Sequence, residues 1–148
     1  MHRLIPMADD ANAEDRRAYL GFIEDAITRM ASEANTLKAW LVPVVTAAYG
    51  YAVVRDSWVV ALVGILATAI LGWQAANYLR QERAYRDLYG SAITAGSVTF
   101  NMNPGDHLPP WRGKKSVLWS WSVFGFFGSI IIGGLVIIAV IAFADLAA

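Results

Sequence analysis

The stretch VLWSWSVFGFFGSIIIGGLVIIAVIAFA, residues 117–144, decides the fold because it is strongly apolar and contains no charged residue. A helix rises about 1.5 Å per residue, so this stretch is long enough to cross a hydrocarbon layer of about 30 Å. Leu37–Val54 and Ser57–Ala76 have the same character, and Lys38 is the one charge in either stretch. A lysine near a span end can extend its ammonium group to the interface. The sequence therefore predicts an all-α membrane protein with three transmembrane helices.

The composition agrees with this class. The chain has 148 residues, of which 57% are hydrophobic, and its mean hydropathy is +0.43. The formal net charge is zero, so no basic excess is available for nucleic acid, and we expect no nucleic-acid partner. There is no cysteine, which excludes disulfides and thiolate metal sites. Residues 1–10 lack the apolar core of a signal peptide, so we expect the first span to insert as an uncleaved anchor.

The basic residues predict the orientation of the spans. Of the 12 Lys and Arg residues, only Arg55 lies between the first two spans. The others precede the first span or lie at its start (Arg3, Arg16, Arg17, Arg29, Lys38) or separate the second from the third (Arg80, Arg83, Arg86, Arg112, Lys114, Lys115). By the positive-inside rule, the N-terminus and residues 77–116 are cytoplasmic and the C-terminus is outside. The tryptophans lie at or near the proposed span ends, as is typical of interfacial rings: Trp40, Trp58, Trp73, Trp111, Trp119 and Trp121.

Residues 1–36 form a predicted cytoplasmic segment with an amphipathic helix over about 13–35. Apolar side chains recur there at spacings of three and four, and charged ones surround the rest of the helix. Such a helix can lie on the inner leaflet or pack against another cytoplasmic element. No Gly or Pro separates it from Leu37, so it either runs into the first span or bends near Asn35-Thr36.

The remaining segments follow from short links and helix breakers. Arg55-Asp56 leaves almost no loop, so residues 37–76 are predicted to form a tight transmembrane hairpin. Over residues 77–116 we expect a helical extension that ends at Gly90, then an ordered loop in which residues 97–102 form a short strand. An aromatic stripe is expected along the extension, with Arg80, Glu82 and Arg83 facing water. The members of the stripe are Tyr78, Ala84, Tyr85, Leu88 and Tyr89.

Small residues at four-residue spacing predict close helix packing and a homo-oligomer. They are Gly64, Thr68 and Gly72 in the second span and Gly125, Ser129 and Gly133 in the third. This pattern allows helices to approach closely in lipid. The packing can be within one subunit or between subunits, and both uses remain open.

Sparse polar residues in the spans are candidates for lining a water path: Thr46, Thr68, Gln74, Asn77 and Ser129. The simpler alternative is that each one satisfies its own helix backbone or a neighbouring helix. Three helices are too few to enclose a solvated pore, so a path of this kind requires self-association.

No catalytic chemistry is evident. Asp106-His107 supplies half of a possible metal site, but no second ligand pair has suitable spacing, and a polar turn explains it better. We therefore predict no enzyme, metal or cofactor. A cytoplasmic partner such as a sensor protein is expected to contact Arg80, Arg83, Tyr85, Arg86 and Tyr89, although the arginines can equally serve only to fix the topology.

Two segments carry a family resemblance. They are YLGFIEDAITRM, residues 19–30, and YLRQERAYRDLY, residues 78–89, on either side of the hairpin. Over residues 13–89 the chain resembles the SLATT-type two-span effectors of bacterial anti-phage and conflict systems. The resemblance implies location in the bacterial inner membrane, and assembly that permeabilises this membrane when a cognate sensor fires. The chain departs from the two-span pattern by adding a third span and the loop over residues 90–116.

Two functions from different classes remain open at this stage. One is an oligomeric inner-membrane effector that permeabilises or depolarises the membrane under control of a partner. The other is a non-conducting anchor or assembly subunit of a larger inner-membrane complex. A neighbouring gene for a nucleotide cyclase, reverse transcriptase or nucleotide-binding sensor would favour the first, and respiratory or envelope-assembly genes would favour the second.

Overall fold

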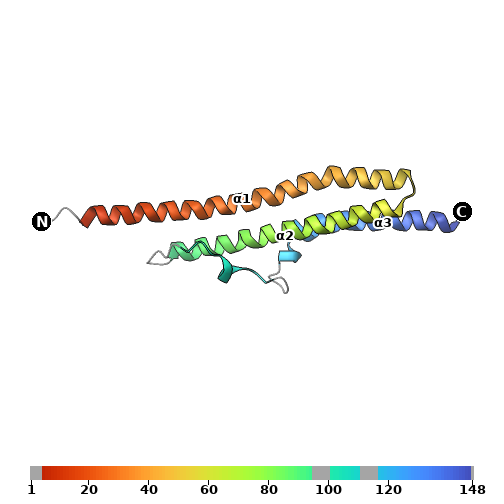
Figure 1. The fold of residues 1–148 in the computed structure, drawn as a ribbon. Coiled ribbons are helices and arrows are strands. Elements are labelled where there is room, and N and C mark those ends of the chain that lie inside the picture. The colour runs from red at the N-terminus through yellow and green to blue at the C-terminus, as the bar shows by residue number, and fades with distance from the viewer. Residues whose placement is uncertain (1–4, 95–100, 111–116, 148) are drawn as a thin grey trace.

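The computed structural model describes residues 5–94, 101–110 and 117–147, and its regular secondary structure is entirely helical (Figure 1). The elements are α1 (Ile5–Val54), α2 (Trp58–Thr94), the 3₁₀ turns η1 (Gly105–His107) and η2 (Val117–Trp119), the π-helical turn η3 (Trp121–Gly125) and α3 (Phe126–Ala147). Three of the described helices are long and apolar enough to span a membrane. The predicted all-α class with three spans is confirmed. Residues 95–100, which hold most of the predicted strand, lie outside the described residues.

α1 is one continuous helix that joins the amphipathic segment to the first span, with no interruption at Asn35-Thr36. It begins at Ile5, about two turns before the predicted start. Pro6 is compatible with this start because the first turn of a helix needs no N–H donor there. Pro43 lies inside α1, and Figure 1 shows the helix changing direction in this orange part. A missing backbone hydrogen bond explains such a bend.

α2 returns antiparallel to α1 after the tight link that the sequence predicts. Asp56 adopts a left-handed conformation with φ of 51°, which Asp tolerates better than most residues. Ser57 N then donates to the Ala52 carbonyl at 2.9 Å, which closes the turn. α2 continues past Gly90 to Thr94, so the predicted end was wrong. A glycine costs a helix only about 1 kcal/mol relative to alanine, and packing of Leu88 against α1 outweighs this cost.

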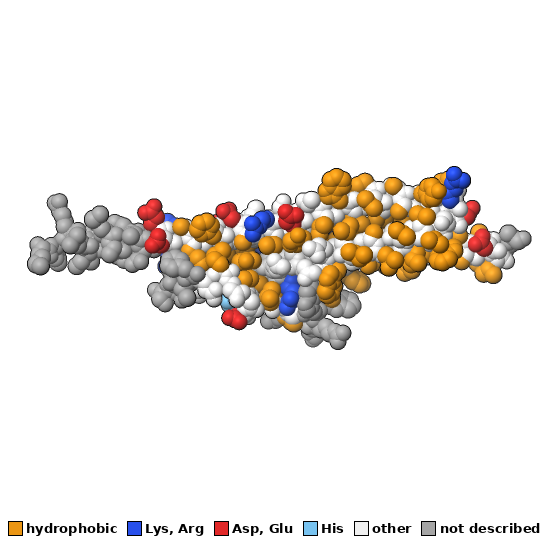
Figure 2. Space-filling model, in the orientation of Figure 1, with side chains coloured by type: hydrophobic (Ala, Val, Ile, Leu, Met, Phe, Trp, Pro, Cys, Tyr) orange, Lys and Arg blue, Asp and Glu red, His pale blue; other side chains and the backbone are white. Residues whose placement is uncertain are grey.

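The molecule divides along its length into an apolar part and a charged part. Figure 2 shows hydrophobic side chains covering the half that contains α3 and the hairpin turn, with a few charged side chains at its far end, whereas charged side chains are spread along the other half. We call residues 37–76 with α3 the bundle, and we call residues 13–36 of α1 with residues 77–94 of α2 the stalk. Nonpolar side chains that would be costly to expose to water are stable in lipid, so the bundle is the membrane part.

Each part has its own apolar core. The core of the bundle contains Leu41, Val45, Ala75, Ala76 and Phe127, together with Val117 and Val123 from the turns just before α3. The core of the stalk contains Tyr19, Ile23 and Leu88, with Ile27, Tyr85, Tyr89 and Ala92 packed around them. The amphipathic segment of α1 therefore packs against α2. Of the two roles expected for this segment, packing against another element is the one observed, and not lying on the inner leaflet.

The third span begins later than predicted and in irregular form. Ser120 is extended, with φ of −66° and ψ of 136°, so the chain cannot be one helix from Val117 onward. The π-helical turn η3 follows, and the regular helix begins at Phe126. Gly125 permits this turn, since a Cβ there would lie 3.1 Å from Cδ2 of Trp121.

Candidate functional site

Two glycines of α2 and one of α3 face other helices of the same chain. A Cβ on Gly64 would lie 2.6 Å from Cε1 of Tyr49, and one on Gly72 would lie 3.0 Å from Cγ of Phe127. A Cβ on Gly134 would overlap Tyr49 and a side chain of α2. The small-residue stripe of the second span thus serves close packing within one chain.

The predicted stripe of the third span is differently placed. Gly125 lies against its own Trp121, whereas Ser129 and Gly133 are exposed. A Cβ on Gly133 would meet no atom within 4 Å, and the same holds for Gly128. α3 therefore presents an outward face of small residues, Gly128, Ser129 and Gly133, which we call the outer α3 face.

The polar side chains at membrane depth mostly bond to their own helices. Thr46 Oγ1 donates to the Val42 carbonyl at 2.8 Å, and Ser129 Oγ donates to the Phe126 carbonyl at 2.9 Å. Thr68 Oγ1 and Asn77 Nδ2 make equivalent bonds to Gly64 and Trp73 at 2.8 and 3.2 Å. Thr68 is fully buried between the helices, whereas Thr46, Gln74 and Ser129 are exposed on the outside of the bundle.

The interior of the chain offers no polar route across the bundle in the residues that the structure describes. Thr68 and Glu82 are the polar residues that are buried there, and Glu82 belongs to the stalk. Of the five candidates for a water path, three face outward. Any such path must therefore lie between copies of the chain, and its existence stays a prediction.

Basic side chains fix the start of the third span. Lys38 Nζ donates to Ser122 Oγ at 2.7 Å, and Arg83 Nη2 donates to Ser120 Oγ at 3.2 Å. We call residues 117–125 the entry segment. Since Lys38 lies on α1 and Arg83 on α2, both helices of the hairpin hold this segment by charge-assisted hydrogen bonds, which are stronger than neutral ones.

Glu82 is 8% exposed, so the prediction that it faces water was wrong. It lies three residues after Leu79, which itself lies four residues after Ala75, and these spacings place Glu82 on the face of α2 that covers α1. Its carboxylate is paired with Arg86 Nη2 at 2.6 Å. A cavity of about 130 Å³ lies beside it, lined among others by Asn35, Lys38 and Ser122. The ion pair offsets part of the cost of removing this charge from water.

Three polar side chains make hydrogen bonds at the distal end of the stalk. The Arg16 guanidinium donates to the carbonyls of Ala92 and Ile93 at 3.4 and 2.9 Å, where it caps the C-terminal carbonyls of α2. Tyr19 Oη donates to the Asn101 carbonyl at 2.7 Å. Tyr89 Oη donates to Glu24 Oε1 at 2.7 Å, and this bond to a carboxylate raises the pKa of Tyr89 above its ordinary value.

All five residues predicted to contact a partner have roles inside the chain. Arg80 Nε donates to the Pro109 carbonyl at 2.7 Å, Arg83 bonds Ser120, and Arg86 pairs with Glu82. Tyr85 and Tyr89 pack in the stalk. Arg86 keeps 63% of its side chain exposed and remains the most accessible of the three arginines. Contact with a partner stays a prediction for all of them.

Asp106 and His107 lie on the single turn η1. The described residues contain no cluster of three or more His, Cys, Asp or Glu side chains placed to hold a metal ion.

Several important residues could not be found from the sequence. Tyr49 and Phe127 fill the space that Gly64, Gly72 and Gly134 leave, yet each looks like an ordinary apolar residue of a span. Lys38 was interpreted only as an interfacial lysine. Its bond to a serine far along the chain depends on how the third span is placed, which periodicity does not reveal.

The chain matches no protein-family model, and comparisons with curated proteins and with solved structures find no similar protein.

Proposed function

We propose that the protein is an oligomeric effector of the bacterial inner membrane that permeabilises or depolarises it under control of a cytoplasmic partner. The outer α3 face carries this proposal. Its glycines have open space around them in the single chain, whereas Gly64, Gly72 and Gly134 are used in packing within the chain. Small residues without a neighbour in lipid favour helix association, because helices pack closely where side chains are short.

The distribution of polar groups supports a path between subunits. Thr46, Gln74 and Ser129 lie on the outside of the bundle, so a ring of chains would turn some of these groups toward its axis. A hydroxyl that bonds its own helix still has lone pairs for water. The spans lack ionisable groups near their middle, which a proton-coupled or charge-moving transporter would need.

The stalk is the part that would receive a signal. It is a packed helical pair continuous with the first two spans, so a displacement at its distal end is transmitted to the bundle by rigid helices. Arg80 connects the stalk to residues 101–110 and Arg83 connects it to the entry segment, while Arg86 is exposed on the stalk, so all three lie within reach of a cytoplasmic partner.

The test is reconstitution into liposomes, with and without a co-encoded sensor, while membrane potential and release of a small dye are followed. We expect the activated protein to collapse the potential, Gly133→Leu to abolish this effect, and Gly50→Leu to retain it. Gly50 is a matched control because it too lies in a span with no atom within 4 Å of its Cβ position. An intact potential with the activated wild-type protein would contradict the proposal.

One observation favours the alternative of a non-conducting anchor. Phe22 is 62% exposed on the stalk, beside an open pocket of about 420 Å³ lined by Asp15, Ala18, Tyr19 and Met102. An exposed aromatic side chain in water is a typical anchor for a protein partner. A stable stoichiometric complex that is lost in Phe22→Ser, together with an intact membrane potential, would favour the anchor.

A further inference from the structure

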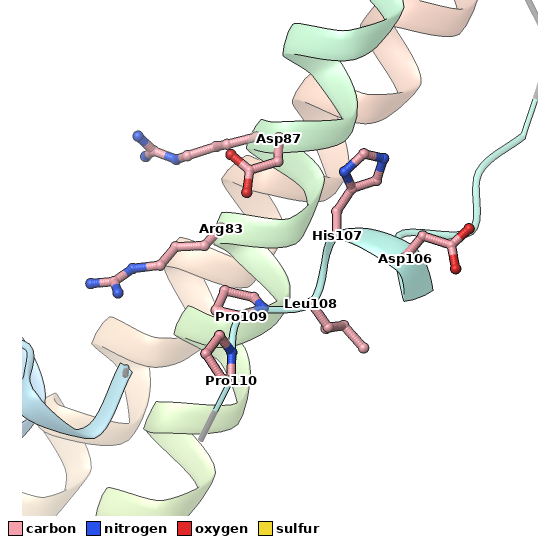
Figure 3. A pocket seen from close by; sticks show the side chains of 8 residues that line it. Arg83, Asp87, Asp106, His107, Leu108, Pro109 and Pro110 are labelled. Atoms are coloured by element: carbon pink, nitrogen blue, oxygen red, sulfur yellow. The ribbon is translucent and has the colours of Figure 1, made fainter. Parts of the chain in front are cut away.

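A larger open pocket, of about 600 Å³, lies between the stalk and residues 104–110, on the side of α2 that faces η1 (Figure 3). α2 contributes Arg83, Arg86 and Asp87 to its lining. Residues 106–110 form the opposite wall, with His107 on one side and the apolar run of Leu108, Pro109 and Pro110 on the other. None of the functions proposed above uses this pocket.

The wall of the pocket is held by hydrogen bonds within the chain. Backbone N–H groups of Asn103 and Gly105 donate to the side-chain oxygens of Asn101 and Asn103 at 2.9 and 3.0 Å, which folds the chain into successive turns. His107 N donates to the Pro104 carbonyl at 2.9 Å. The bond from Arg80 to Pro109 then holds the wall against α2. A ligand would therefore meet a formed site and would not have to order the chain.

The guanidinium groups of this pocket offer hydrogen-bond donors to an anion. A guanidinium group has five N–H donors, and the bonds to Ser120 and Glu82 use one nitrogen of Arg83 and one of Arg86. Figure 3 shows the carboxylate of Asp106 directed away from Arg83. Glu82, which is paired with Arg86, and Asp87 are then the carboxylates beside the two guanidinium groups, and His107 also lines the pocket.

We propose that this pocket binds a phosphate-bearing small molecule from the aqueous phase. The planar guanidinium fork matches two phosphoryl oxygens at once, so Arg83 and Arg86 would hold the phosphate group. The Leu108–Pro110 wall would cover an apolar or aromatic part of the same molecule. Arg83 also bonds Ser120 of the entry segment, so an occupied pocket would bear directly on the start of the third span.

The position along α2 favours a soluble ligand over a lipid headgroup. Trp73 is 54% exposed at the end of the apolar part of α2, and Arg83 follows after roughly ten residues, or about 15 Å of helix. The headgroup layer is only about 5–8 Å thick on each side. Arg86, three residues further along α2, therefore lies in water beyond the phosphates of ordinary phospholipids, while Arg83 reaches Ser120 at the start of the third span.

The test uses the full-length protein in nanodiscs of pure phosphatidylcholine, with adenosine monophosphate and inorganic pyrophosphate as probes and calorimetry as the readout. We expect saturable binding that Arg86→Gln weakens about tenfold or more, since a bond to a charged group contributes at least about 1.5 kcal/mol. Arg86→Lys should also weaken it, because lysine lacks the fork. Arg29→Gln, at an exposed arginine of α1 away from the pocket, should bind as the wild type does.

His107→Gln keeps the test valid if Arg86→Gln misfolds, because His107 lies on a short turn outside the helix packing. The absence of saturable binding by the wild type would overturn the proposal. Equal binding by the wild type, by Arg86→Gln and by His107→Gln would also overturn it. If the pocket is occupied only in nanodiscs that contain a phosphatidylinositol phosphate, the proposal is overturned in favour of a lipid-binding site. Since no conductance is measured, the outcome is independent of the proposed permeabilising function.

Discussion

Lys38 Nζ donates a hydrogen bond of 2.7 Å to Ser122 Oγ, which joins the start of the first span to the π-helical turn before α3. The same ammonium group lies 5.8 Å from the ring centroid of Phe126, a cation–π distance. Two contacts to residues far along the chain thus fix the level at which the third span begins. A lysine that only extended to the interface would need neither of them.

We expect Lys38→Met to release the entry segment, residues 117–125. It removes one charge-assisted hydrogen bond and one cation–π contact, together worth about 1–3 kcal/mol. Amide hydrogen exchange in detergent should become faster over this segment, while Lys38→Arg, which retains charge and donors, should change it little. Unchanged exchange in Lys38→Met would show that packing of Val117 and Val123 alone fixes the segment.

Gly133 and Gly134 are neighbours with opposite environments, and they separate folding from self-association. Gly134→Leu should destabilise the single chain, because a side chain there overlaps Tyr49, and overpacking in a formed core costs about 1–3 kcal/mol or more. Gly133→Leu should leave the thermal midpoint unchanged and shift the native mass in detergent to smaller species. A wild-type mass in Gly133→Leu would mean that the outer α3 face faces only lipid.

The stalk should lose one contact at alkaline pH. The bond to Glu24 raises the pKa of Tyr89, so its protonated form is favoured in the folded state. The corresponding stabilisation is fully present below the ordinary tyrosine pKa of about 10 and is lost as pH rises through the raised value.

A thermal-unfolding series across this alkaline range tests the contact, with Tyr89→Phe as the control. The wild type should lose more stability than the variant above pH about 10. Glu24→Gln should lower the pKa of Tyr89 toward its ordinary value, which tyrosinate absorbance can follow. Parallel pH profiles of the wild type and Tyr89→Phe would contradict an energetic role for this bond.

The sequence predicts the spans well because their signal is local. Long charge-free stretches predict the three helices, and a two-residue link predicts the hairpin, without knowledge of any contact. The predicted helix ends are wrong where contacts between helices determine where a helix begins or ends. α2 passes Gly90 because α1 packs beside it, and the third span starts irregularly because Ser120 is extended and Trp121 needs the space beside Gly125.

The candidate sites are harder to predict, since they depend on which face of a helix is covered. The repeat of small residues identified Gly64, Gly72 and Gly133 alike, but only the first two contact other helices of the chain. Glu82 was expected in water because it is charged, although its spacing from Ala75 and Leu79 places it on the covered face. Considering its position on the helix together with its charge would have corrected the predicted exposure of Glu82. No local pattern would have revealed the pocket of Arg83 and Arg86, because its second wall comes from a later segment.

The orientation in the membrane is the last prediction. Eleven of the 12 basic residues lie before the first span or between the second and third, so the stalk is expected in the cytoplasm. The chain has no cysteine, so single cysteines can be introduced without background. Ser32 and Thr94 are exposed on the stalk, Ser57 lies at the hairpin turn, and Leu146 is 87% exposed near the end of α3.

A membrane-impermeant maleimide applied to intact bacterial cells should label cysteines at positions 57 and 146 and leave those at positions 32 and 94 unlabelled. Permeabilised cells provide the control, in which all four should react. Because the link between the first two spans is only two residues long, positions 32 and 57 must lie on opposite sides if both spans cross. Labelling at 32 and 94 in intact cells, with none at 57, would invert the topology and move the stalk and its arginine pocket away from any cytoplasmic sensor.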